Sequence, residues 1–173
     1  ACSVLAAASA TRFLYKGSNM STLQNKIAIV TGAASGIGKA IAELFAERGA
    51  TVVPVDRDAT SSCDVSDEQQ VRDMVQRTLD EHGRIDVLVN NAGVNFSKPF
   101  EQMTAGEWDR VIGVDLRGTF LCTHACIDTF IKQQSGSVVN IASVHATACM
   151  PGAAPYDAAK WGVVGMTKAL AVE

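Results

Sequence analysis

Tyr156 and Lys160 are separated by three residues, so in a helix they would lie one turn apart on the same face. A free phenol ionises at about pH 10, and a neighbouring cation is the simplest means of lowering that pKa. Such a pair could exchange a proton with a substrate, although the same spacing also arises by chance on exposed helices. Ser143 precedes Tyr156 by 13 residues and follows an apolar segment, where its hydroxyl could hold a substrate oxygen. Together the three residues could hold a substrate oxygen and exchange a proton with it.

Gly32, Gly36 and Gly38 lie in the segment TGAASGIG, directly after the apolar run KIAIV and before a run with helical spacing. The N-terminus of a helix offers unpaired N–H groups and a favourable dipole to an anion, and glycines let that anion approach the backbone. An acid at the end of the next strand completes the usual context of a dinucleotide site. That acid is Asp56, 18 residues after Gly38.

Asp56 predicts the choice of dinucleotide. A carboxylate at this place accepts hydrogen bonds from the adenosine ribose and repels a 2′-phosphate, which favours NAD over NADP. Arg57 is the opposing feature, because a guanidinium beside the ribose could bind that phosphate. The alternative interpretation of Asp56 is a solvated turn residue.

The segment from Thr31 to Gly38 resembles the TGxxxGIG turn of the short-chain dehydrogenase/reductase family, and Asn90 to Gly93 resembles its NNAG motif. With Ser143 and the YxxxK pair, the resemblance extends from Leu23 to Glu173. It implies a catalytic set of Ser143, Tyr156, Lys160 and Asp115. It also implies that the dinucleotide is bound by Gly32, Ser35, Gly36, Ile37, Gly38, Asp56, Arg57, Asp64, Val65, Asn90, Ala92, Gly93, Tyr156 and Lys160, with Asp64 and Val65 along the adenine.

The family resemblance implies an oxidoreductase that moves hydride between NAD(H) and a secondary alcohol or ketone. Tyr156 would act as general acid and base, Lys160 would assist it and contact the nicotinamide ribose, and Ser143 would orient the reacting oxygen. Two alternatives stay open. One is an NADPH-dependent carbonyl or 3-oxoacyl-carrier reductase, and the other is a dinucleotide-binding fragment without turnover. The sequence does not identify the substrate.

Asp115 departs from the family pattern. The resemblance places an asparagine there, whose backbone carbonyl supports a water chain from the lysine to solvent. Because that role belongs largely to the main chain, Asp115 could still serve, while its carboxylate would alter the local electrostatics. His145 either lines the substrate pocket or faces solvent from a loop.

Apolar segments that read as strands alternate with segments that read as helices. The expected helices are 37–48, 67–82, 104–133 and 153–173, and the expected strands lie near 26–30, 51–55, 85–90 and 135–143. Thr104 and Glu107 form a capping-box pattern, and Pro54 suggests a bulge or weak pairing in its strand. The alternation predicts an α/β fold with a doubly wound parallel sheet of the Rossmann type.

Two parts of this fold are expected to be short. Only seven residues separate Asp56 from Asp64, too few for a crossover helix, so the strand there should be a stub around 62–64. The family continues beyond the Tyr156 helix, so the sheet is expected to be incomplete at its C-terminal edge. An exposed VVNIA edge would then favour aggregation, and residues 1–173 alone should be poorly soluble and turn over little.

Composition and charge limit the classes of molecule that the protein is expected to bind. A formal charge of -3 and a pI near 5.6 argue against nucleic acid, and no apolar run is long enough to span a membrane. The five cysteines have no CxxC spacing, which favours reduced thiols, no metal site and a cytoplasmic protein. Residues 1–19 read as a disordered leader or, less clearly, as an organelle transit peptide before a domain spanning 20–173. Helices 104–133 and 153–173 are the expected surfaces of a homodimer or homotetramer.

Overall fold

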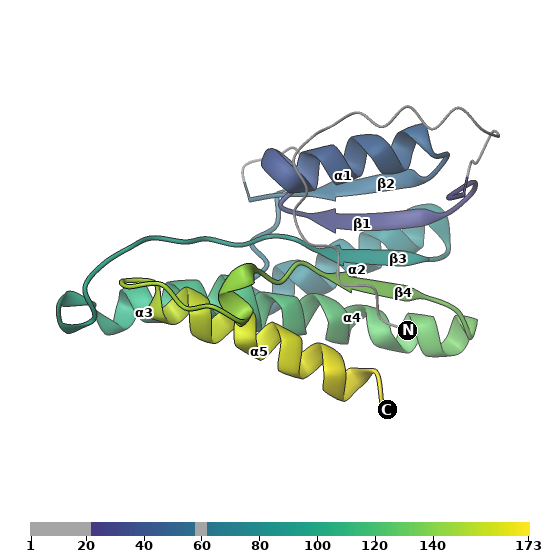
Figure 1. Cartoon of the computed structure of the whole chain (residues 1–173). Helices are drawn as coiled ribbons and strands as arrows, with labels where there is room; N and C mark the ends of the chain where they lie inside the picture. The colour runs from purple at the N-terminus through teal and green to yellow at the C-terminus, as the bar shows by residue number, and fades with distance from the viewer. Residues whose placement is uncertain (1–21, 58–61) are drawn as a thin grey trace.

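The computed structural model describes residues 22–57 and 62–173. Its centre is a parallel sheet of four strands in the order β2-β1-β3-β4. The strands are β1 (Ile27–Thr31), β2 (Thr51–Val55), β3 (Val87–Asn90) and β4 (Ser137–Asn140). Helices connect successive strands and cover both faces of the sheet (Figure 1). The predicted Rossmann-like α/β fold is therefore confirmed.

The helices begin and end close to the predicted residues. They are α1 (Gly36–Glu47), α2 (Glu68–His82), α3 (Ala105–Ile112), α4 (Gly118–Gln133) and α5 (Ala154–Leu170), with short 3-10 turns at Phe100–Gln102 and Val144–Ala146. Thr104 and Glu107 form the expected capping box. Asp67 caps α2 by accepting the amides of Gln69 and Gln70. The local polar signals thus placed the helix ends correctly.

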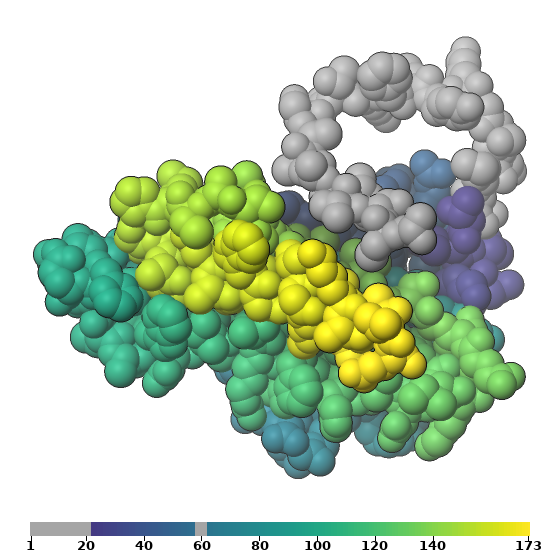
Figure 2. Space-filling model, turned by 60° about the horizontal axis from the view of Figure 1, so that its bottom comes forward, coloured from purple at the N-terminus to yellow at the C-terminus, as the bar shows by residue number. Residues whose placement is uncertain are grey.

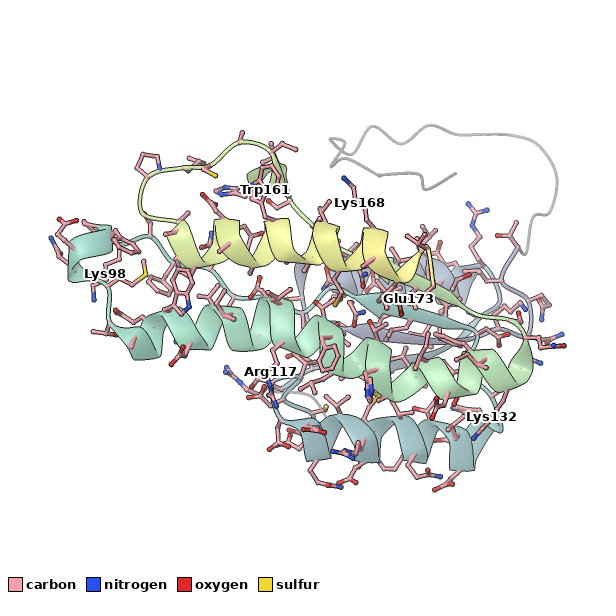
Figure 3. The ribbon with its side chains drawn as sticks, turned by 90° about the horizontal axis from the view of Figure 1, so that it is seen from below. Lys98, Arg117, Lys132, Trp161, Lys168 and Glu173 are labelled. Atoms are coloured by element: carbon pink, nitrogen blue, oxygen red, sulfur yellow. The ribbon has the colours of Figure 1, made fainter. Side chains whose placement is uncertain are left out.

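Alternate residues of each strand face two separate cores. Helix α1 packs on one face of the sheet, against residues such as Ala28, Val30 and Val89. The opposite face is covered by α2, α4 and α5, which lie side by side in front of the sheet in Figure 3. Its buried residues include Ile29, Val55, Leu88, Met74, Leu121, Cys122 and Cys126. Cys122 and Cys126 therefore serve as core side chains.

The predicted helix over 104–133 is not uniform. Between α3 and α4, residues Gly113–Arg117 form a π-helical segment, in which the backbone is wound more loosely. Asp115 lies in this segment and is completely buried. Its carboxylate accepts the amide of Val94, beyond β3, and pairs with Lys160 of α5. Helical periodicity did not signal this change in winding.

The second strand also differs from expectation, whereas the short connection after it was predicted. Val30 pairs with Pro54 in an unbroken register, so the suggested bulge is wrong. Proline is tolerated because β2 is the last strand of the described sheet on that side, where its missing N–H costs no ladder bond. The stub expected around 62–64 is present among the described residues as a single parallel bridge between Asp56 and Ser62.

Strand β4 ends the described sheet on the other side. Val139 in this strand is 44% exposed. Among the described residues no helix is long and apolar enough to cross a membrane. The predicted leader over 1–19 lies outside the described residues.

Candidate functional site

The predicted site residues meet at the carboxyl ends of the strands, where parallel α/β sheets bind their ligands. The glycine turn follows β1, Asp56 follows β2, the NNAG segment follows β3 and Ser143 follows β4. Helix α5 brings Tyr156 and Lys160 to the same edge, since Lys160 Nζ donates a hydrogen bond to the carbonyl of Ile141, just beyond β4 (3.2 Å).

The glycine turn depends on backbone space that a side chain would fill. Gly32 and Gly36 have φ values of +67° and +54°, which favour glycine. A Cβ at Gly38 would lie 2.1 Å from the carbonyl oxygen of Gly32, so the first turn of α1 can pack this closely only without a side chain. Ser35 stands at the N-cap of α1, but its side chain caps no amide. The amides at this helix end are therefore available to an anion.

Thr31 and Asn91 join the glycine turn to the NNAG segment, and neither was predicted as a site residue. Thr31 Oγ1 accepts hydrogen bonds from the amides of Asn91 and Ala92, both at 3.0 Å. Asn91 Nδ2 donates back to the carbonyl of Thr31 at 2.9 Å. Each residue belongs to a motif that the sequence did reveal, so the motifs themselves were the signal.

Of the two acids assigned to the adenosine end, Asp56 contacts the glycine turn and Asp64 bonds within its own loop. Asp56 Oδ2 accepts the amide of Ala34 at 3.0 Å, which places the carboxylate across the glycine turn, with Arg57 next in the chain. Asp64 Oδ1 accepts both the amide and the hydroxyl of Ser66. Val65 is only 6% exposed, and its side chain packs against Gly118 of α4.

Tyr156, Lys160 and Asp115 form one charged cluster. Lys160 Nζ lies 5.3 Å from the centroid of the Tyr156 ring, within the range of a cation–π contact. The same nitrogen lies 3.2 Å from Asp115 Oδ2, as an ion pair that is not aligned as a hydrogen bond. Lys160 is 4% exposed and Asp115 is 0% exposed, so this pair is shielded from solvent.

Asp115 also fixes the NNAG segment. Its Oδ1 accepts the amide of Val94 at 2.7 Å, and a Cβ at Gly93 would lie only 2.8 Å from Oδ2. Burial raises the pKa of the Asp115 carboxyl, while the charge of Lys160 and the Val94 amide act against that rise. The backbone carbonyl of Asp115, which the family resemblance linked to a water chain, accepts a hydrogen bond from Thr119 Oγ1 at 2.9 Å. A carbonyl oxygen has a second lone pair, so this bond does not exclude a further partner.

Ser143 is oriented by its own loop. Its Oγ accepts the amide of His145 at 3.2 Å and begins the turn Val144–Ala146. With this acceptor position used, the hydroxyl proton remains available to a substrate oxygen. The His145 ring in turn lies nearly perpendicular to the Tyr156 ring, with their centroids 5.2 Å apart.

The chain resembles proteins of one family over nearly all of its described length. The profile of the family described as short chain dehydrogenase matches residues 26–173. A subunit of a hydroxy(phenyl)methylsuccinyl-CoA dehydrogenase from Thauera aromatica is 42% identical, and the match covers 87% of this chain and 68% of that protein. A 3-oxoacyl-acyl-carrier-protein reductase from Thermotoga maritima is 40% identical over 87% of this chain and 69% of its own length.

Solved structures give the same result. The ligand-free aldohexose dehydrogenase of Thermoplasma acidophilum superposes with a TM-score of 0.84 at 38% sequence identity. This match covers 88% of the present chain and 63% of that structure. The chain thus spans about two thirds of the length of the relatives that it matches.

Proposed function

The chain belongs to the short-chain dehydrogenase family, and from that premise we propose that the protein transfers hydride between NAD(H) and a secondary alcohol or ketone. The observation that carries this proposal is the position of Tyr156. Its ring lies beside the buried ammonium group of Lys160, at the same sheet edge as the glycine turn. Proton transfer and dinucleotide binding therefore have their groups at one place.

The residues present fit a dinucleotide. A Cβ at Gly36 would meet nothing within 4 Å, so space lies open before the N-terminus of α1. The amides after Ser35 would hold the pyrophosphate, Asp56 the adenosine ribose and Lys160 the nicotinamide ribose. When bound, the nicotinamide supplies the hydride acceptor for oxidation or the hydride donor for reduction.

The side chains supply the proton chemistry. In the direction of oxidation, Tyr156 Oη takes the proton of the substrate hydroxyl, and the charge of Lys160 favours the phenolate that receives it. The Ser143 hydroxyl donates to the substrate oxygen and holds it in place. In the direction of reduction, Tyr156 returns the proton to the oxygen.

NAD is the proposed dinucleotide because the Asp56 carboxylate lies across the glycine turn from Ala34. The test is the ratio of kcat/KM for NAD to that for NADP, measured with a panel of secondary alcohols on the full-length protein. We expect NAD to be preferred by at least about tenfold, and Asp56→Ala to reduce that preference. A ratio that favours NADP, and that Asp56→Ala leaves unchanged, would contradict this assignment.

A reductase of carrier-bound 3-oxoacyl groups is the second candidate. It is favoured by the similarity to the Thermotoga maritima reductase and by Arg57, which follows Asp56 directly. The same comparison of dinucleotides, run in the direction of reduction with a 3-oxoacyl thioester, separates the two functions. A dinucleotide-binding protein without turnover would instead enhance NADH fluorescence and convert none of the substrates.

We further propose that the full-length protein self-associates through α4 and α5. Phe120 and Ile131 on α4 are 47% and 67% exposed, and Trp161 on α5 is 52% exposed. Figure 2 shows α5, in yellow, lying along the surface beside α4, in green. Sedimentation should report a dimer or tetramer that Trp161→Glu dissociates, and a monomeric wild-type protein would contradict this proposal.

A further inference from the structure

His145 and Asp157 form a second, partly buried pair beside the Tyr156 ring. His145 Nδ1 is hydrogen-bonded to Asp157 Oδ1, and Asp157 Oδ2 accepts the amide of Met150 at 3.1 Å. The two side chains are 14% and 8% exposed. Partial desolvation acts to raise the pKa of Asp157, but the bonds from His145 and Met150 outweigh it and hold that pKa below its ordinary value. Asp157 is therefore a carboxylate at neutral pH.

This bond to Nδ1 leaves Nε2 as the imidazole nitrogen that can bind a ligand. Nε2 has no hydrogen-bond partner among residues 22–57 and 62–173. The fully buried side-chain nitrogens and oxygens that lack a partner in these ranges are Asn90 Oδ1 and Asp115 Oδ2 alone. Nε2 is not one of them and is accessible from outside the protein.

The imidazole lies next to the groups that would hold the reacting oxygen. Its ring stands at 83° to the Tyr156 ring, with the centroids 5.2 Å apart. Its own main-chain amide orients the Ser143 hydroxyl. A substrate held between Ser143 and Tyr156 would therefore have its neighbouring atoms within reach of His145.

A purely structural role would explain part of this arrangement. One structural role would be to attach the loop from Ser143 to Met150 to α5. The bond from the Met150 amide to Asp157 already attaches it, and that bond uses no side chain of the loop. The bond to Asp157 also fixes the orientation of the His145 imidazole and leaves its Nε2 free to bind a ligand. A carboxylate behind a histidine fixes its tautomer and orientation in the same manner at many ligand sites.

We propose that His145, oriented by Asp157, is a specificity-determining residue that binds an oxygen substituent of the substrate next to the reacting carbon. A neutral ring with its proton on Nδ1 would accept from a hydroxyl, and a charged ring would donate to a carboxylate. In both cases the recognised group is an oxygen close to the alcohol carbon. This proposal rests on the proposed function, because it places the reacting oxygen at Tyr156.

The test compares kcat/KM for three alcohols on the full-length protein with NAD, namely butan-2-ol, butane-2,3-diol and 2-hydroxybutanoate. We expect one of the two substituted alcohols to be preferred by about tenfold or more, since a site built to bind an oxygen rejects the analogue without it. His145→Leu should abolish that preference mainly through KM. His145→Gln, which keeps a neutral hydrogen-bonding group, should retain a preference for the diol and lose one for the acid.

His82→Gln is the matched control, because His82 ends α2 at the opposite edge of the sheet and should leave the ratios unchanged. Asp157→Asn keeps an acceptor for the Met150 amide and should weaken the preference without loss of folding. If butan-2-ol is oxidised in a reaction that requires Tyr156, but His145→Leu leaves the ratios at their wild-type values, the proposed contact is wrong while the proposed function stands. Absence of turnover with all three alcohols would instead count against the proposed function.

Discussion

At the scale of single residues, the most distinctive feature is the buried ion pair of Asp115 and Lys160. The Lys160 ammonium contacts both the Tyr156 ring and the Asp115 carboxylate. The negative charge of the carboxylate therefore cancels part of the positive field of the ammonium at the ring. An asparagine at position 115, as in the family pattern, could keep the Val94 bond without the negative charge. Asp115 therefore weakens the positive field at the phenol relative to that arrangement.

Asp115→Asn should increase activity at low pH. The substitution leaves in place the bond from Lys160 Nζ to the Ile141 carbonyl and its contact with the Tyr156 ring. Without the opposing carboxylate the positive field at the ring is stronger, and the acidic limb of the profile of kcat/KM against pH should shift to lower pH. A limb that stays in place, or moves to higher pH, would show that Asp115 does not moderate Lys160.

At the same scale, sequence reasoning found the groups that carry chemistry but not all of those that position them. The spacing of Tyr156 and Lys160 was sufficient to predict that the two side chains lie close together, because one helical turn sets the distance between them. The partners of Asp115 were not predictable, since Val94 and Lys160 reach it from elements far away in the sequence. Asn91 belongs to the recognised NNAG motif, but its bonds to Thr31 were not predictable, because they cross between two strands.

At the scale of elements, capping residues in the sequence predicted where the helices begin and end. The features that differ from prediction depend on contacts between elements. Thr104 with Glu107, and Asp67 with Gly83, marked helix ends through bonds within a few residues. The π-helical segment around Asp115 follows from buried contacts that no periodicity encodes. The unbroken pairing of Pro54 follows from the position of β2 at the sheet edge, which the sequence of one strand does not specify.

The packing of α5 against the π-helical segment can be tested with two glycines on the same helix. A Cβ at Gly162 would lie 2.8 Å from Leu116 Cδ2, whereas a Cβ at Gly165 would meet nothing within 4 Å. Gly162→Ala should be less favourable than Gly165→Ala, because the end of the Leu116 side chain must move to admit the new methyl group. Gly165→Ala should stabilise it by up to about 1 kcal/mol, because alanine favours the helix. Urea unfolding measures both, and equal effects would contradict the close contact between α5 and Leu116.

At the scale of the whole molecule, Asp86 joins the starts of two central strands. Its carboxylate accepts the amide of Ile27 at 3.0 Å and forms ion pairs with Arg84 and Lys26. Burial acts to raise the pKa of Asp86, but these partners hold it below the ordinary value. The side chain is 3% exposed, while the two cations remain substantially exposed.

This lowered pKa predicts how stability depends on pH. The contribution of Asp86 is present above the pKa of the unfolded chain, about 4, and is lost as the pH falls through the lower pKa of the folded state. The free energy of unfolding should therefore decrease as the pH falls below about 4, and Asp86→Asn should reduce that decrease. Urea titrations at several pH values measure it. If the variant loses stability on acidification as steeply as the wild type, Asp86 is not a source of the dependence.

The most direct test of the proposed function is Tyr156→Phe in the full-length protein, assayed for NAD reduction by secondary alcohols and for NADH binding by fluorescence. The substitution removes only the phenol oxygen and leaves the ring beside Lys160 and His145. We predict that turnover falls by about a hundredfold to ten-thousandfold, which is the usual contribution of a general acid or base. The affinity for NADH should change little. Turnover at the wild-type rate would contradict the account.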